Sequence, residues 1–205
     1  TPEDESGDVH LFTVALAERC ARAGVEFRYS TRATRLLTQG GTVQGVEVIE
    51  PDGRYGAVSA DAYVVAMGSF SPNMLRPLGI PCNVYPAKGY SATFPVLKPE
   101  ATPTVSLTDS SHKIVFSRLG DRLRMAGTAE LSGYSRGLNT SRCEALTRLA
   151  QELFPDALDF ARVSYWSGLR PSTPSNVPII GRSRIPNLYI LSLIHISEPT
   201  RPERI

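Results

Sequence analysis

The spacing of apolar residues near the start of the chain predicts a helix. Val9, Phe12, Leu16 and Cys20 recur at intervals of three and four, as on one face of an α-helix. Asp8 is a suitable N-cap, and Gly24 is a suitable C-terminal stop. Residues 25–29 then alternate between apolar and polar, which predicts a strand.

Alternating and continuous apolar runs predict strands over the next part of the chain. Residues 35–37 and 43–49 flank Gly40-Gly41, which is a hairpin signal, and residues 51–53 read Pro-Asp-Gly, a turn. Residues 60–68 form a mostly apolar run, so we expect a strand buried on both faces. Ser71 and Pro72 predict a short helix with Ser71 as its cap.

From about Pro77 the pattern changes to short strands separated by turns. We expect strands at 90–96, 104–107, 113–117 and 123–126, forming an antiparallel sheet in a second lobe. Ser141 and Glu144 form a capping box for a helix that ends at Pro155. Residues 163–168 lead back toward the first lobe. The predicted fold class is α/β (α+β).

Composition and charge narrow the class of protein. Of the 205 residues, 41% are hydrophobic and 20% charged, as in ordinary globular proteins. A net charge of +2 without a dense basic block argues against nucleic-acid binding. Cys20, Cys82 and Cys143 form no C-x-x-C motif, so neither a zinc site nor a redox dithiol is indicated. No apolar run is long enough to cross a bilayer, and the acidic first residues are unlike a signal peptide.

Arg170 is the main candidate for ligand binding. It lies in the run Ser167–Pro174, after an aromatic pair, where we expect the end of a buried strand. A guanidinium there needs an anion, and its planar fork suits a carboxylate. From spacing alone, an internal salt bridge to Asp or Glu is the favoured explanation.

A second candidate is the end of the apolar strand, Ala66-Met67-Gly68. Ligands of open α/β sheets bind at the carboxyl ends of strands, and a glycine there lets the backbone approach a ligand closely. From these residues alone, a tight strand exit without a ligand is the favoured explanation. The sequence contains no G-x-G-x-x-G fingerprint.

The order of motifs resembles the flavoprotein subunit of the bacterial D-amino-acid dehydrogenase family, in the D-amino-acid oxidase and glycine oxidase superfamily. The motifs that carry this resemblance are Thr1–Glu5, Gly24–Tyr29, Tyr63–Ser69, Tyr85–Ser91, Arg118–Ala129, Trp166–Pro171 and Pro178–Arg182. The resemblance covers the chain from Thr1 to about Ile190. The family's phosphate-binding glycine loop would precede Thr1, and its C-terminal flavin loop would follow Tyr189.

The resemblance implies a partial FAD-binding Rossmann-like lobe with an inserted antiparallel substrate lobe. It implies FAD contacts at Ala33, Ala66, Met67 and Gly68, and a substrate carboxylate on Arg170. The implied reaction is oxidative deamination of D-amino acids such as D-alanine to 2-oxo acids and ammonia. Reduced flavin would pass electrons to a respiratory acceptor, the quinone pool. The implied location is the cytoplasm, or the inner-membrane surface as a peripheral protein. We expect no protein acid or base to be required if the amine arrives neutral, and we expect no metal.

The expected domain boundaries are 1–76 for the FAD-binding lobe, 77–166 for the substrate lobe and 167–190 for the return. Residues 191–205 resemble a translated sequencing adapter, so we expect them to be non-native and do not consider His195 catalytic. We expect the chain itself to be inactive. Alternatives are a glycine- or sarcosine-oxidase-like flavoenzyme, or a non-catalytic fragment.

Three aromatic residues have competing explanations. Tyr90 would line a substrate pocket or pack within the sheet. Tyr134, in a glycine-flanked loop, would cover the site or lie in an exposed turn. Trp166 would stack on the cofactor or, as we expect, lie in the core. We expect His112 at the surface.

Overall fold

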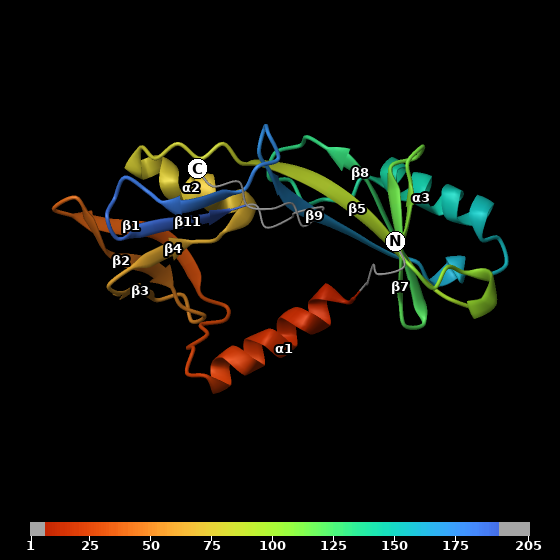
Figure 1. Ribbon diagram of the computed structural model, residues 1–205, viewed down its shortest axis with the longest axis horizontal. Coiled ribbons are helices and arrows are strands. Elements are labelled where there is room, and N and C mark those ends of the chain that lie inside the picture. Colours follow the sequence, from red (N-terminus) through yellow and green to blue (C-terminus); the bar gives the residue numbers. More distant parts are fainter. Residues whose placement is uncertain (1–6, 193–205) are drawn as a thin grey trace. The chain divides into compact units, whose positions relative to one another are not determined.

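The computed structural model describes residues 7–192 and divides into two compact units (Figure 1). One unit consists of Arg28–Ala87 and the residues from Arg170 onward. The other consists of Lys88–Leu169 with the N-terminal residues up to Phe27. The expected tail at 191–205 falls mostly outside the described residues, as does His195, although Leu191 and Ser192 belong to the last strand.

The unit that begins at Arg28 contains two small sheets. An antiparallel sheet has the order β1-β2-β3, made of β1 (Arg32–Gln39), β2 (Thr42–Ile49) and β3 (Tyr55–Val58). The second sheet has the order β10-β11-β4, made of β10 (Ile179–Arg182), β11 (Leu188–Ser192) and β4 (Tyr63–Val65). In that sheet β11 and β4 are parallel, which gives the unit its α/β character.

Short helices follow β4 directly: η1 (Gly68–Phe70), α2 (Ser71–Leu75) and η2 (Arg76–Leu78). Leu75 and Leu188, both 0% exposed, belong to a cluster that joins these helices to the two sheets. Asn187 connects the sheets through its side chain. Its Oδ1 accepts from the Val43 N–H at 3.0 Å and its Nδ2 donates to the Val43 carbonyl at 2.8 Å.

The unit around Lys88–Leu169 contains a five-stranded sheet of order β6-β7-β8-β5-β9. Its strands are β5 (Tyr85–Pro95), β6 (Leu107–Asp109), β7 (Ile114–Leu119), β8 (Arg122–Glu130) and β9 (Ser164–Ser172). Of two short 3-10 turns, η3 (Pro99–Ala101) lies between β5 and β6, and η4 (Phe160–Arg162) precedes β9.

Helix α3 (Thr140–Leu153) covers one face of this sheet (Figure 1). Phe94, Leu123 and Met125 are 0% exposed and pack with Leu146 of the helix. The residues of β5 that alternate with Phe94 lie on the opposite face, because successive side chains of a strand point to opposite sides.

The N-terminal helix α1 (Val9–Arg22) forms as predicted. Asp8 caps it, with its carboxylate accepting from the backbone N–H groups of His10 at 2.9 Å and Leu11 at 3.2 Å. Gly24 follows with φ +95°. None of the residues of α1 is buried.

Turn signals were the most reliable part of the sequence pattern. The hairpin at Gly40-Gly41 is confirmed, with positive φ angles of 60° and 78° between antiparallel β1 and β2. The turn at Asp52-Gly53 is confirmed too, where the Gly53 N–H donates to the Glu50 carbonyl at 2.9 Å. Both turns depend on residues that tolerate unusual backbone angles, which is a local property.

Several element predictions were wrong where neighbours in space decide. Residues 25–28 form no strand, and the strand predicted at 104–107 is instead β6, which begins at Leu107. Helix α3 begins at Thr140 with Asn139 as N-cap, so Ser141 lies inside it. In β4, Val64 is 61% exposed, so this strand is not buried on both faces. An apolar run alone does not show whether a second layer covers it.

Candidate active site

The exit of β4 is the first part of the candidate site. The strand ends at Val65, three residues before the end of the predicted run at 60–68, and Ala66 and Met67 are exposed beyond its carboxyl end. The Met67 N–H donates to the Ser71 hydroxyl at 3.2 Å, and Ser71 is 0% exposed. Ser71 is the first residue of α2 and does not cap the helix as predicted. Its hydroxyl instead accepts the hydrogen bond that fixes the turn before the helix.

Gly68 allows this turn to form. Its φ is +53°, in the left-handed region that residues with a Cβ rarely adopt. A Cβ at this position would lie 3.7 Å from Cγ of Pro171, which is ordinary contact, so the backbone angle is the stronger requirement. The structure thus places Gly68 beside the residue that follows Arg170.

Arg170 is exposed within β9, so the expectation of a buried strand end was wrong. Trp166 on the same strand is 53% exposed, so the expectation that it lies in the core was wrong as well. Among the residues that the structure describes, no Asp or Glu forms an ion pair with Arg170. The internal salt bridge favoured from spacing is therefore not found there. The guanidinium remains able to take an external anion, and a carboxylate matches its fork.

Ala33 lies in β1 opposite Val48, just before an irregularity between Ala33 and Arg35. It packs against the cluster that contains Val65, the residue before Ala66. The neighbouring Glu47 carboxylate accepts from Arg35 at 2.8 Å and from Thr34 at 2.8 Å, and these bonds, Arg35 first, lower the pKa of Glu47. The cofactor contacts predicted at Ala33, Ala66, Met67 and Gly68 stay predictions.

Tyr90 belongs to a charged cluster in the five-stranded sheet. It is 2% exposed, and its hydroxyl donates a short hydrogen bond to Glu130 Oε2. Lys88 Nζ, also on β5 and 3% exposed, lies 3.3 Å from the same oxygen. Arg142 Nε of α3 is 4.0 Å away from it. We call Lys88, Tyr90, Glu130 and Arg142 the Glu130 cluster.

The hydrogen bonds of this cluster favour its charged forms. The bond from Tyr90, followed by that from Lys88, lowers the pKa of Glu130 despite partial burial. Tyr90 and then Glu130 raise the pKa of Lys88 against the opposing effect of desolvation. The Tyr90 hydroxyl donates its proton to Glu130. The predicted role of Tyr90 in substrate binding stays a prediction.

Sequence reasoning missed Lys88, Glu130 and Arg142. The only available signal was the alternation that places Lys88 on the same strand face as Tyr90. Tyr134 is 38% exposed in the loop between β8 and α3, next to Gly133 with φ +60°, and its predicted role is likewise untested.

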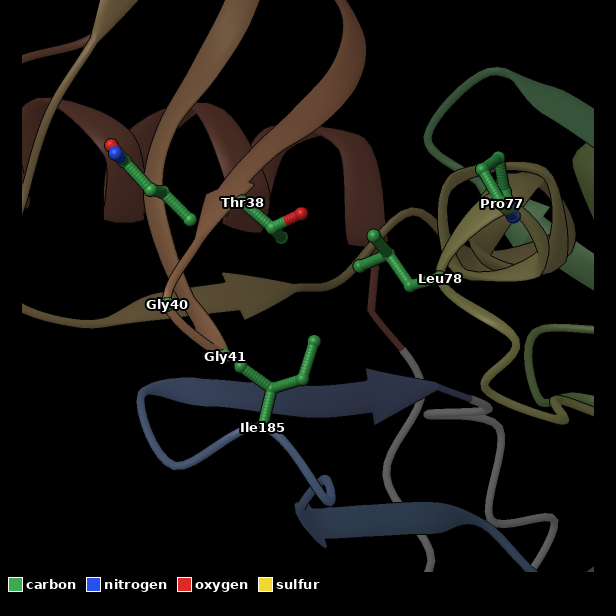
Figure 2. Close-up of a pocket in the computed structure, with 7 residues that line it drawn as sticks. Thr38, Gly40, Gly41, Pro77, Leu78 and Ile185 are labelled. Atoms are coloured by element: carbon green, nitrogen blue, oxygen red, sulfur yellow. The ribbon is translucent and has the colours of Figure 1, made fainter.

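Two pockets lie in the unit that begins at Arg28, and neither is lined by a titratable side chain. One, of about 330 Å³, is lined by Thr38, Gln39, Gly40, Gly41, Pro77, Leu78 and Ile185 (Figure 2). Thr38, Leu78 and Ile185 direct their side chains toward this hollow (Figure 2). The other, of about 310 Å³, is formed by Asn83 and the loop from Thr173 to Ile179. The Thr173 hydroxyl closes this loop by donating to the Val177 carbonyl at 2.9 Å.

Over the described residues, we find no helix with the length and apolar character that a membrane crossing requires.

A parallel strand pair with a glycine turn at its carboxyl end is typical of folds that bind nucleotide cofactors. The family profile "DAO: FAD dependent oxidoreductase" matches residues 1–194. The chain therefore belongs to the FAD-dependent oxidoreductase family, and the predicted fold class is confirmed.

The chain is similar to proteins named D-amino acid dehydrogenase. It is 52% identical to that of Dechloromonas aromatica (strain RCB), over 93% of this chain and 46% of the relative. It is 49% identical to that of Methylobacterium radiotolerans, over 92% of this chain and 44% of the relative. The chain thus spans about half the length of these relatives.

A solved structure of glycine oxidase from Bacillus cereus ATCC 14579 has a similar fold. It aligns with a TM-score of 0.72 at 22% identity, over 88% of this chain and 48% of that protein. At this identity the similarity supports the fold alone.

Proposed function

We propose that this chain forms part of a D-amino acid dehydrogenase that oxidatively deaminates D-amino acids. The observation that carries the proposal is the 52% identity over 93% of the chain to a protein of that name. The exposed Arg170, without an ion pair to any described carboxylate, supports it, because every amino acid substrate has a carboxylate for such a group to bind.

The residues at the exit of β4 fit a dinucleotide cofactor. Ala66 and Met67 are exposed beyond the carboxyl end of a parallel strand, and Gly68 adopts the left-handed angle of the turn that follows. Bound FAD would supply the two-electron acceptor for the substrate hydride. Arg170 would bind the substrate carboxylate and thereby fix which face of Cα is presented for oxidation. The resulting imine would be hydrolysed by water to a 2-oxo acid and ammonia.

We further propose a respiratory quinone as the final electron acceptor, and a cytoplasmic protein that contacts the inner membrane peripherally. Both follow from the family resemblance alone.

Substrate comparison tests the proposed reaction. In a full-length protein containing this segment, D-alanine should be oxidised with release of ammonia and pyruvate, and sarcosine should be oxidised much more slowly. L-alanine is the matched control for stereochemistry. Oxidation of sarcosine without oxidation of D-alanine would instead establish a sarcosine-oxidase-like enzyme.

The isolated 205-residue chain should not turn over substrate, because it contains no G-x-G-x-x-G loop to hold the pyrophosphate. We expect the purified chain to lack the visible flavin absorption bands after incubation with FAD and desalting. A stoichiometric flavin spectrum would show that this expectation is wrong.

A further inference from the structure

Ser71 holds the turn after β4 at two points. Its hydroxyl accepts from the Met67 N–H at 3.2 Å, and its own backbone N–H donates to the Gly68 carbonyl. A third bond crosses the same turn, because the Phe70 N–H donates to the Met67 carbonyl at 3.0 Å. Together these hydrogen bonds fix the backbone from Met67 to Ser71 in one conformation.

The same bonds use the backbone groups of Met67. Its N–H donates to Ser71 and its carbonyl accepts from Phe70. A backbone N–H has a single proton, so the N–H of Met67 is not free to donate to a ligand. Met67 would therefore contact a cofactor through its side chain, which is 38% exposed, and not through its N–H.

The core fixes the position of the Ser71 hydroxyl. Ser71 is 0% exposed, and Met74 and Leu75, three and four residues further along α2, are 6% and 0% exposed. Both belong to the hydrophobic cluster that contains Val65, the last residue of β4. Packing therefore determines where the hydroxyl lies, whereas Met67, whose N–H it binds, is exposed.

We propose that Ser71 is a positioning residue for the cofactor, whose hydroxyl keeps the turn after β4 in the conformation that receives FAD. Ser71 acts through Met67 and Gly68 and does not itself touch the cofactor. This inference rests on the proposed function, since it assumes that FAD meets the chain at the exit of β4. Alanine at position 71 would leave the Met67 N–H without its acceptor, and only the fraction of molecules with the correct turn would then bind.

FAD affinity tests the role of Ser71. In the apoprotein of a full-length protein containing this segment, Ser71→Ala should raise the dissociation constant of FAD about three- to tenfold. Quenching of flavin fluorescence on titration with apoprotein measures this constant. Ser71→Cys keeps the size of the side chain with a weaker acceptor, so it should raise the constant by a smaller factor.

Ser183→Ala is the matched control. The Ser183 hydroxyl accepts from the Ile185 N–H at 3.0 Å, in the turn between β10 and β11, so the variant removes a bond of the same kind in the same unit. This turn lies before the amino end of β11, away from the exit of β4. Ser183→Ala should lower the urea midpoint of unfolding but leave the FAD dissociation constant unchanged within about twofold.

The comparison separates positioning from general destabilisation. An unchanged FAD dissociation constant in Ser71→Ala, or an equal rise in Ser183→Ala, would overturn the inference. If Ser71→Ala does not fold, Ser71→Cys and Ser183→Ala give the same comparison. Flavin affinity does not depend on which amino acid is oxidised. The predicted effect of Ser71→Ala in a protein that leaves D-alanine unoxidised would therefore support this inference and contradict the proposed function.

Discussion

Arg170 and Gly68 show what single residues contribute to the candidate site. Arg170 offers an exposed guanidinium, and Gly68 accepts a backbone angle of +53° that places its turn beside Pro171. The type of residue could be read from the sequence in both cases. What could not be read was that Arg170 forms no ion pair with a described carboxylate, because that depends on which acidic residues come near it in the fold.

Replacing Arg170 tests its role as the carboxylate ligand. In a full-length protein containing this segment, Arg170→Gln should lower kcat/KM for D-alanine roughly 100-fold, mainly through KM, because a charge-assisted bidentate contact is lost. Arg170→Lys should recover only part of the loss. Arg148→Gln, at an exposed residue of α3, is the control. Unchanged steady-state kinetics of Arg170→Gln would exclude the assigned role.

At the scale of elements, the Glu130 cluster joins β5, β8 and α3. Lys88 and Glu130 are direct cross-strand partners, and Tyr90 and Arg142 add a hydroxyl and a second cation. Lys88 is almost fully buried, so its ammonium depends on the Glu130 carboxylate for compensation.

Removing only the Glu130 carboxylate should destabilise the fold more than removing the charges of both Lys88 and Glu130. Glu130→Gln should lower the urea midpoint of unfolding, because it leaves the Lys88 ammonium buried without an opposite charge. The double variant Lys88→Met with Glu130→Gln should unfold at a higher urea concentration than Glu130→Gln alone. Circular dichroism at several urea concentrations measures both. If the double variant were less stable than Glu130→Gln alone, the unpaired Lys88 ammonium would not be the cause of the destabilisation.

At the scale of the whole molecule, each unit has its own hydrophobic cluster and its own stabilised carboxylates. Hydrogen bonds from Arg35 lower the pKa of Glu47 in one unit. Those from Arg162 and Tyr90 lower the pKa values of Asp159 and Glu130 in the other.

These shifts fix the sign of the pH dependence. A carboxyl group whose pKa is lower in the folded than in the unfolded chain stabilises the fold above its unfolded pKa of about 4 and loses that contribution as the pH falls through the folded pKa. The thermal midpoint of the chain should therefore stay nearly constant from about pH 7 to 5 and fall below about pH 4. Melts monitored by circular dichroism across this range measure it. A thermal midpoint that rises on acidification would contradict the lowered pKa values of these carboxyl groups in the folded chain.

The sequence predicted correctly the features that depend on residues close together in the chain, and wrongly several that depend on residues far apart in it. The cap at Asp8, the stop at Gly24 and the Gly40-Gly41 hairpin were confirmed because each depends on neighbouring residues along the chain. The positions of Val64 and Trp166 were predicted wrongly because exposure depends on whether another layer covers a face.

The sequence by itself determined the family, the order of the lobes' motifs and the residue types at the exit of β4, since these follow from local pattern and resemblance. Only the tertiary structure decided which side chains meet. It paired Lys88 with Glu130, left Arg170 without a described carboxylate partner and placed Arg124 beside the exposed Trp166. Such pairings depend on strand register and neighbour order, which bring together residues far apart in the chain and cannot be read from either segment alone.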